Sequence, residues 1–173
     1  MKKIIFLCGF CGSGKDYFAD KLINNDISQY DMPLTFPYNL NFKECLRLSF
    51  AMKLKELFCE KYGLDIKYLE ENKKFYRNKI IEFAKEIRKY DDSYFARHIL
   101  KQIEASNKNI ILITDLRFKI EYETIKQKYN DVSIYYIQRI EDGKYQEPSN
   151  ESDFVFLNEI VYEKQTITYV LNN

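Results

Sequence analysis

The chain has 173 residues, of which 46% are apolar and 31% charged, a balance typical of one globular domain and not of a disordered or membrane-spanning chain. Its formal net charge of +1 gives no overall attraction to nucleic acid or to a membrane surface, so any anion site must be local. No apolar run approaches a membrane span, and the five apolar residues after Lys2-Lys3 are too few for a signal peptide. We therefore expect a cytoplasmic protein.

The first predicted element is a strand buried on both faces, Ile4 to Cys8 (IIFLC). It leads into GFCGSGKD (residues 9–16), which has the G-x-x-x-x-G-K pattern of a phosphate-binding loop. A helical pattern follows, as such a loop requires. Glycines let the backbone turn its N–H groups toward phosphate oxygens, and the helix N-terminus adds positive potential. The sequence therefore predicts a site for the phosphates of a nucleotide.

Lys15 is the residue of this loop that can reach the β- and γ-phosphates. Asp16 stands where Ser or Thr normally ligates Mg²⁺, and a carboxylate oxygen is also a suitable ligand for that ion. The alternative for Asp16 is an acidic residue that favours the helix dipole. The predicted nucleotide-binding residues are Gly9, Phe10, Cys11, Gly12, Ser13, Gly14, Lys15, Asp16 and Tyr17.

Cys8 and Cys11 have the C-x-x-C spacing of a redox or zinc pair. No second such pair exists, and the sole histidine, His98, is far away in the sequence. We expect reduced thiols without metal or redox chemistry.

The middle of the chain is predicted to be mostly helical. Residues 24–41 resemble a long loop and Leu46 to Phe50 a second strand. Three helices should follow, one ending at Gly63, one amphipathic from Lys73 to Lys89, and one capped by Asp92 or Ser93. The stretch from Ala51 to Ala105 is too long for a simple crossover, so we interpret it as an inserted substrate-binding region.

Arg77 and Arg88 lie eleven positions apart and therefore share a face of their helix. They could hold a phosphate bidentately, or they could be solvated surface charges. Arg97 is a further candidate.

A second buried strand is expected from Asn109 to Asp115 (NIILITD), followed by a helix marked by Phe118, Tyr122, Ile125 and Tyr129. Because ligands bind beyond the carboxyl ends of parallel strands, Asp115 should point toward the glycine loop. It could hold Mg²⁺ or its water, orient Arg117 or a substrate hydroxyl, or cap the following helix.

A further strand is expected at residues 132–138, and then a polar loop at residues 139–153 that Arg139 opens. Phosphoryl-transfer enzymes often carry a mobile lid at such a place. Lys144 is expected to be a surface charge. The segment EIVYEK (residues 159–164) is a possible last strand.

Strands alternating with helices predict an α/β fold, a three-layer parallel sheet with a phosphate-binding loop (P-loop), a helical substrate-binding insertion and a lid loop. We expect one domain over residues 1–173. Its core would be residues 1–50 and 107–173, with the helical acceptor-binding region at about 51–106 and the lid at about 139–152.

Several segments resemble two related groups of small P-loop kinases, the viral-type deoxynucleoside monophosphate kinases and the animal-type phosphomevalonate kinases. GSGKDYFAD is similar to their SGKD-type loop, in which Asp after the Lys is usual. The other similar segments are RLSFAMKLKEL (with Lys55), RKYDDSYFAR (with Arg88), ITDLRFKIEYETI (with Asp115, Arg117 and Glu121) and SNESD.

The resemblance implies an NMP-kinase-like fold and transfer of the γ-phosphoryl group of ATP, with Mg²⁺, to a deoxynucleoside monophosphate. Lys15, Asp16, Arg117 and Arg139 would be catalytic, and Asp16 and Asp115 would assist the metal. Lys55, Arg77, Arg88, Asp115 and Arg117 would bind the acceptor. We expect no nucleic-acid or membrane partner and, for a viral chain, the host cytoplasm. The sequence leaves the choice between monomer and homodimer open.

Two alternatives stay open. A phosphomevalonate kinase would use the same arginines without a base pocket. A nucleotide-binding module would bind ATP without transferring phosphate.

Overall fold

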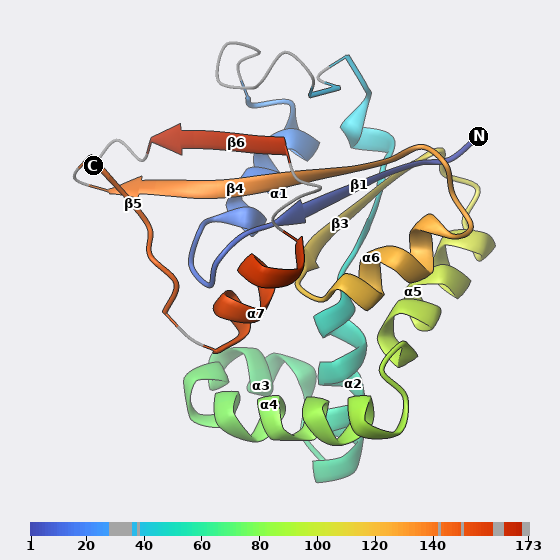
Figure 1. Ribbon diagram of the computed structural model, residues 1–173. Helices are drawn as coiled ribbons and strands as arrows, with labels where there is room; N and C mark the ends of the chain where they lie inside the picture. Colours follow the sequence, from blue (N-terminus) through green and yellow to red (C-terminus); the bar gives the residue numbers. More distant parts are fainter. Residues whose placement is uncertain (28–35, 38, 142, 150, 161–164, 171–173) are drawn as a thin grey trace.

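The computed structural model describes residues 1–27, 36–37, 39–141, 143–149, 151–160 and 165–170. Its centre is a mainly parallel sheet with helices on both faces (Figure 1). The strands β2 (Leu46–Leu48), β3 (Ile110–Leu116), β1 (Lys3–Cys8) and β4 (Val132–Glu141) lie side by side in that order and run parallel. The predicted α/β class is therefore confirmed.

Two further strands complete the sheet. β6 (Gln165–Val170) runs parallel to β4, and the short β5 (Lys144–Tyr145) pairs antiparallel with the end of β4. The predicted parallel sheet has one antiparallel pair, at β5, because Gly143 adopts a positive φ of 73° and lets the chain fold back on itself.

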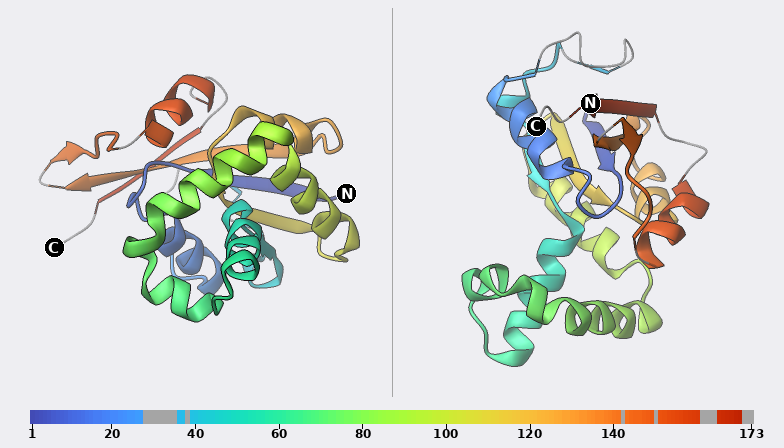
Figure 2. Two further views of the ribbon diagram at one scale, coloured as in Figure 1. Left: turned by 90° about the horizontal axis from the view of Figure 1, so that it is seen from below. Right: turned by 90° about the vertical axis from the view of Figure 1, so that its left-hand side faces the viewer.

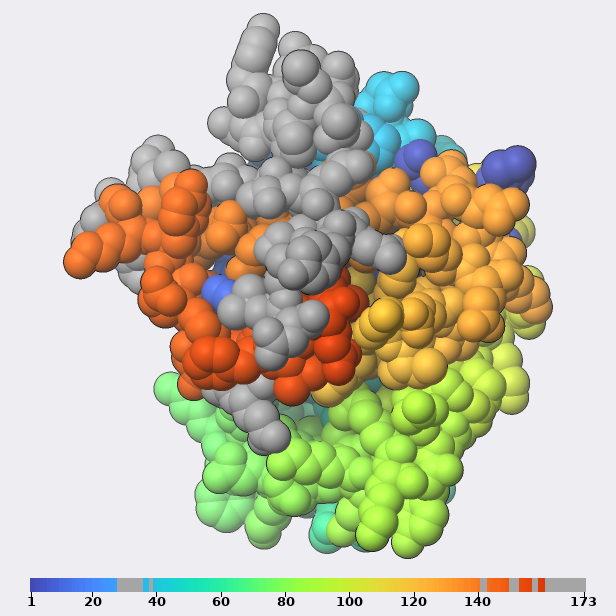
Figure 3. All heavy atoms as spheres, viewed as in Figure 1, coloured from blue at the N-terminus to red at the C-terminus, as the bar shows by residue number. Residues whose placement is uncertain are grey.

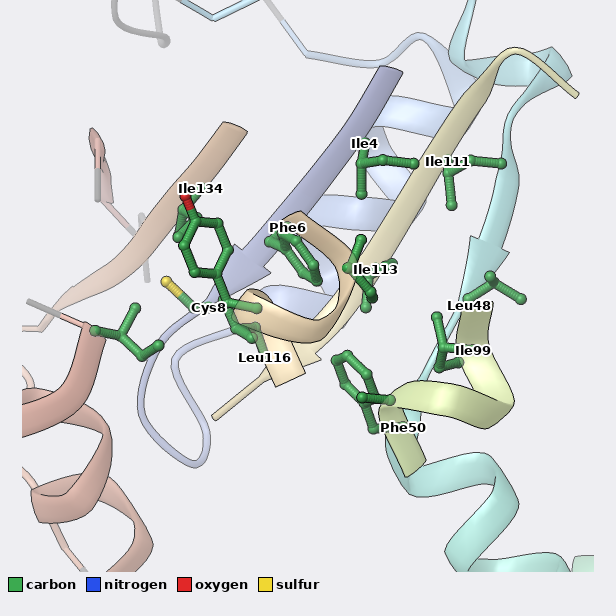
Figure 4. Packing of buried hydrophobic residues seen from close by; sticks show 14 of the residues in the cluster. Ile4, Phe6, Cys8, Leu48, Phe50, Ile99, Ile111, Ile113, Leu116 and Ile134 are labelled. Atoms are coloured by element: carbon green, nitrogen blue, oxygen red, sulfur yellow. The ribbon is translucent and has the colours of Figure 1, made fainter. Parts of the chain in front are cut away.

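The central strand β1 is buried on both faces because helices cover both sides of the sheet. On one face, Phe6 lies beside Ile113 of β3 and Ile134 of β4 in a core that also contains Phe50 and Ile99 (Figure 4). This face is covered by α5 (Tyr94–Ala105), α6 (Lys119–Lys126) and α7 (Glu151–Ile160).

The second face of the sheet is covered by α1 (Lys15–Asn24). Figure 2 shows α1 on the side of the sheet opposite to α6 and α7. Phe18 and Leu22 of α1 pack with Phe36 and Phe42 against Leu7 of β1 and its neighbours. Phe42 opens a short 3-10 helix, Phe42–Glu44, within the region predicted to precede β2; residues 28–35 and 38 of the predicted long loop lie outside the described residues.

The helical region forms the lower part of the molecule in the space-filling view (Figure 3). It contains α2 (Phe50–Tyr62), α3 (Ile66–Glu71) and α4 (Lys73–Tyr90), and α5 leads back to the sheet. The predicted stop at Gly63 is confirmed, with a left-handed φ of 65°. Helix α3 was not predicted. Its N-cap is Asp65, whose carboxylate accepts hydrogen bonds from two backbone N–H groups, those of Lys67 and Tyr68.

The end of the chain differs most from the sequence-based expectation. Residues 139–153 were expected to be a loop, but β4 continues to Glu141 and α7 begins at Glu151. The predicted strand at residues 159–164 is wrong at its start, since Glu159 and Ile160 end α7; residues 161–164 lie outside the described residues. Asp153, Phe156 and Ile160 are buried at helical spacing, a pattern hidden by the polar residues around them.

Candidate active site

The glycine loop joins β1 to α1 and packs closely on the neighbouring strand. Gly9 has a φ of 151°, and a Cβ at this position would lie 2.4 Å from the carbonyl oxygen of Ile137 in β4. Gly14 has a left-handed φ of 82° at the N-cap of α1. Within the described part of the chain, the N–H groups of Gly12, Gly14, Lys15 and Asp16 have no hydrogen-bond acceptor. A helix N-terminus with such N–H groups favours an anion.

Lys15 begins α1 and folds back over the loop, with 8% of the residue exposed. Its Nζ donates to the carbonyl oxygens of Gly9 at 3.0 Å and Phe10 at 2.7 Å. Burial, helped by the positive charge of Arg117, lowers the pKa of Lys15 to about 8. The amine is thus close to the loop, at the place expected from the sequence.

Asp16 is exposed and forms an ion pair with Arg47 of β2 at 2.7 Å. The same guanidinium contacts Asp20, one turn further along α1, at 2.5 Å. Arg47 was not among the predicted site residues, because β2 meets α1 only through the folded sheet. It holds Asp16 beside Lys15 and offsets part of the acidic charge near the expected phosphates.

Asp115 lies in β3, and its carboxylate holds the start of α2. Oδ1 accepts from the N–H of Phe50 at 2.9 Å, and Oδ2 accepts from the N–H of Ala51 and the hydroxyl of Ser49, both at 2.8 Å. Because all three donors point at this carboxylate, the geometry favours a capping role over a metal ligand. The helix that it caps is α2 and not the one that follows it in the sequence.

Arg88, near the end of α4, faces the buried carboxylate of Glu121 in α6. The two groups lie 3.6 Å apart, and the guanidinium stacks on Phe118 with its carbon 4.1 Å from the ring centroid. Glu121 also accepts from the N–H groups of Arg117 at 3.0 Å and Phe118 at 3.1 Å. Burial outweighs these favourable partners and raises the pKa of Glu121 to about 7.

Arg117 stands between the loop and the helical region. Its positive charge lowers the pKa values of both Lys15 and Arg88, although burial is the larger cause in each case. Its Nη1 lies 3.3 Å from Oδ1 of Asp153. Three cations from different elements, Lys15, Arg88 and Arg117, therefore gather where anions would be bound.

Arg77 and Arg139 both approach the glycine loop. Arg77 of α4 donates to the sulfur of Cys11 at 3.2 Å, and Arg139 of β4 lies 3.5 Å from the carbonyl oxygen of Gly12. Arg77 and Arg88 contact different partners, the loop and Glu121, so they do not form one bidentate pair.

The other candidates lie elsewhere. Lys55 of α2 forms an ion pair with Glu70 of α3, and Arg97 pairs with Asp91 beside the start of its own helix. His98 lies on α5, and burial lowers its pKa. Lys144 is exposed, as expected.

Asp153 is the main residue that the sequence analysis missed. It is 0% exposed and accepts from the N–H of Cys11 at 3.1 Å, so it joins α7 directly to the glycine loop. The sequence signal was an acid spaced three residues before the apolar Phe156, within a stretch interpreted as loop.

The four cysteines are thiols without disulfide bonds. Among the residues that the structure describes, no group of three or more His, Cys, Asp or Glu side chains could hold a metal ion. In the same residues, none of the helices combines the length and the apolar character that a bilayer crossing requires.

An α/β fold with a glycine loop and nearby cations is the arrangement of a phosphate-binding P-loop protein. The family model of phosphomevalonate kinase matches residues 7–131, which is more than half of the chain. The protein belongs to the phosphomevalonate kinase family. This is one of the two groups that its motifs resemble, and the match supports this group rather than the deoxynucleoside monophosphate kinases.

Among solved structures, an unliganded sugar kinase from Janibacter sp. HTCC2649 is similar, with 8% identity and a TM-score of 0.43. The similarity covers 98% of this chain and 86% of that chain, and at this TM-score it carries no argument about function. The comparison with curated proteins found no match.

Proposed function

We propose that this protein transfers the γ-phosphoryl group of ATP to the phosphate group of a small phosphomonoester, with phosphomevalonate as the leading acceptor. The observation that carries the proposal is the set of contacts around Arg117. Its backbone N–H shares the carboxylate of Glu121 with Arg88 of the helical region, and its guanidinium lies 3.3 Å from Asp153, which accepts from the N–H of Cys11 in the glycine loop. Two anion-binding parts that share one arginine suit a reaction between two phosphate groups. The family match supports the choice of acceptor.

The donor half of the site would be the glycine loop. The N–H groups at the start of α1 would bind the β- and γ-phosphates, and Lys15 would exchange its contacts with Gly9 and Phe10 for phosphate oxygens. The positive charge of Lys15 would then follow the charge that moves from the γ-phosphate to the leaving oxygen.

Asp16 fits a Mg²⁺ site better than Asp115 does. Its carboxylate is exposed next to the loop and is held by Arg47, whereas both oxygens of Asp115 already accept hydrogen bonds. Bound Mg²⁺ would supply charge neutralisation on the phosphate oxygens. We therefore assign Asp16 to the metal and Asp115 to the support of α2.

The acceptor half would be formed by Arg88 and Arg117. The carboxylate of Glu121 faces the guanidinium of Arg88 and accepts from the backbone N–H groups of Arg117 and Phe118. One buried acid therefore fixes the side chain of Arg88 and the backbone of Arg117. Arg77 would approach from the loop side, and Arg139 would complete the donor half. Since Lys55 is engaged with Glu70, we assign it to the packing of α2 on α3.

The reaction needs no general base, because the acceptor phosphate is already an anion at neutral pH. One of its oxygens forms the new bond to the γ-phosphorus while the bond from that phosphorus to the β-γ bridging oxygen breaks. ADP leaves with the electron pair of the broken bond. The catalytic contribution is then positioning and charge stabilisation by Lys15, Arg88 and Arg117.

The test is an ADP-release assay with Mg-ATP and a panel of acceptors, namely phosphomevalonate, deoxynucleoside monophosphates and ribonucleoside monophosphates. We expect turnover with phosphomevalonate, and loss of at least about 100-fold in kcat for Lys15→Met. The Lys15→Met variant also controls for contaminating kinases.

The panel separates the alternatives. Turnover with a deoxynucleoside monophosphate and none with phosphomevalonate would move the acceptor to the nucleotides. Tight binding of Mg-ATP without turnover on any acceptor would favour a nucleotide-binding module and overturn the proposed transfer.

A further inference from the structure

The carboxylate of Asp153 is completely buried and surrounded by donors. Oδ1 accepts from the N–H of Cys11 at 3.1 Å and lies 3.3 Å from Nη1 of Arg117. Oδ2 accepts from the N–H and the hydroxyl of Ser149, both at 3.2 Å. With 0% of the residue exposed, the carboxylate replaces its hydration with these donors.

The helix that carries Asp153 is fixed at the same place by aromatic packing. Phe156, one turn further along α7, lies edge-on to Phe10 of the glycine loop, with 6.3 Å between the ring centroids. It also packs on Tyr136 of β4 at 5.4 Å. The rings prevent α7 from turning, so the carboxylate has one position relative to the loop.

One oxygen of Asp153 therefore contacts a residue from each half of the site. The amide of Cys11 belongs to the donor loop, and Arg117 is the cation shared with the acceptor half. Charge-assisted hydrogen bonds of this kind are directional and stronger than those between neutral groups.

We propose that Asp153 is a positioning residue that sets Arg117 against the glycine loop, and thereby aligns the acceptor phosphate with the γ-phosphate. The inference rests on the proposed function for its kinetic part, while its effect on the loop is independent of any acceptor. Asp153 itself touches neither reacting phosphate.

The main variant is Asp153→Asn, which keeps the size of the side chain and removes its charge. One of the two carboxylate oxygens is then replaced by an NH₂ group, which faces a hydrogen-bond donor instead of accepting from it. We expect kcat to fall about 10–100-fold with the KM for the acceptor changed less than about threefold, because Arg117 is still present but misaligned. We also expect the Kd for Mg-ATP to rise about 3–10-fold through the loop.

The matched control is Glu159→Gln on the same helix. Glu159 accepts from the N–H of Lys119 in α6 at 2.9 Å and, among the residues that the structure describes, contacts neither the loop nor Arg117. It should leave kcat and the Kd for Mg-ATP within about twofold of the wild-type values. Equal losses in the two variants would mean that α7 docking alone matters, and would overturn the proposal.

A double-mutant cycle identifies the residue through which Asp153 acts. In an Arg117→Lys background, Asp153→Asn should lower kcat less than about threefold, because the aligned fork is already lost. Full additivity of the two changes would overturn the role of Asp153 toward Arg117.

Two further outcomes keep the test decisive. If Asp153→Asn does not fold, as judged by circular dichroism, the variant to use is Ser149→Ala, which removes one hydrogen-bond donor to Asp153. We expect this variant to lower kcat about threefold. An unchanged kcat overturns the proposal. If the wild-type protein turns over no acceptor, the proposed function fails, and the Kd for Mg-ATP then tests Asp153 alone. A folded Asp153→Asn variant that binds Mg-ATP with the wild-type Kd overturns the proposed role of Asp153.

Discussion

At the scale of single residues, the lowered pKa of Lys15 predicts that the affinity of the proposed ATP site depends on pH. Its pKa of about 8 in the free protein means that the charged form decreases as the pH rises through that value. Bound phosphates prefer the charged form. We expect the Kd for Mg-ATP to rise about 10–30-fold between pH 7.5 and 9.5, measured by titration calorimetry.

Lys15→Arg is the control for this titration, since a guanidinium stays charged over the whole range. Its Kd, whatever its value at pH 7.5, should stay nearly constant up to pH 9.5. Parallel pH profiles for the two proteins would contradict a role for the Lys15 amine.

Glu121 gives a second titration, which affects the stability of the folded protein. Its pKa is raised to about 7, so between pH 4.5 and 7 the folded protein holds a proton that the unfolded chain has released. The stability of the folded state therefore decreases as the pH rises through this window. Relative to Glu121→Gln, we expect the unfolding free energy to fall by about 2–3 kcal/mol from pH 4.5 to 7.

The glutamine variant is informative because its carbonyl oxygen can still accept from the N–H groups of Arg117 and Phe118. Urea titrations of both proteins at several pH values measure the difference. A difference that does not depend on pH would show that Glu121 does not titrate in this range.

Site residues that belong to a local sequence motif could be predicted from the sequence. Site residues that reach the loop only through tertiary contacts could not. Lys15 and Asp16 follow from the glycine loop in which they stand. Arg47 and Asp153 meet that loop only after β2 and α7 are in place, 31 and 142 positions away from their partners Asp16 and Cys11.

At the scale of elements, the carboxylate of Asp115 shows how two neighbouring strands support one helix. β2 and β3 run parallel, so the start of α2, which follows β2, lies near the end of β3. The sequence predicted the position of Asp115 at this edge. It did not reveal the partner, because strand order had to be known first.

Asp115→Asn tests this account. One acceptor oxygen becomes a donor that faces Phe50 or the pair Ser49 and Ala51, which should destabilise the protein by about 1–3 kcal/mol and lower Tm by about 3–10 °C. Thermal melts followed by circular dichroism provide the measurement.

The Mg²⁺ requirement separates capping from metal binding. The Mg²⁺ concentration for half-maximal turnover should be unchanged in Asp115→Asn and raised about 5–10-fold in Asp16→Asn. A raised Mg²⁺ concentration for half-maximal turnover in Asp115→Asn would show that Asp115 is a metal ligand.

The elements themselves were predictable where the apolar pattern was strong. The strands at Ile4, Asn109 and Val132 are continuous apolar runs, and α4 is strongly amphipathic. α3 and α7 were missed because one has six residues and the other begins among polar residues.

At the scale of the whole molecule, the helical region has a small core of its own. Phe58, Cys59 and Leu69 are buried together, with Phe83 and Tyr76 packed against them, and no strand contributes to this cluster among the described residues. Such a region can open locally while the sheet stays folded.

Phe58→Ala should therefore impair the acceptor half of the proposed site and leave the donor half intact. Removal of this fully buried ring costs about 3–5 kcal/mol, so amides of α3 and α4 should lose protection in hydrogen exchange while those of β1 and β3 keep it. The Kd for Mg-ATP should stay within about threefold, and acceptor turnover should fall at least about tenfold.

Phe6→Ala is the matched change in the core of the sheet. It should reduce protection in all strands at once, because Phe6 of the central strand β1 packs on Phe50 of α2 and Tyr122 of α6. Loss of protection throughout the protein in both variants would mean that the helical region has no separate stability.

The contact between Cys11 and Asp153 also bears on the order in which the protein folds. The glycine loop leaves the ribosome well before α7, but β1 pairs with β3 and β4, and the loop meets α7 across 142 positions. Contacts this distant form late, since the intervening chain must be ordered first. A nascent chain that ends before α7 would have its first strand and helix without the loop geometry that nucleotide binding requires. We therefore expect affinity for ATP to appear only in the last stage of folding.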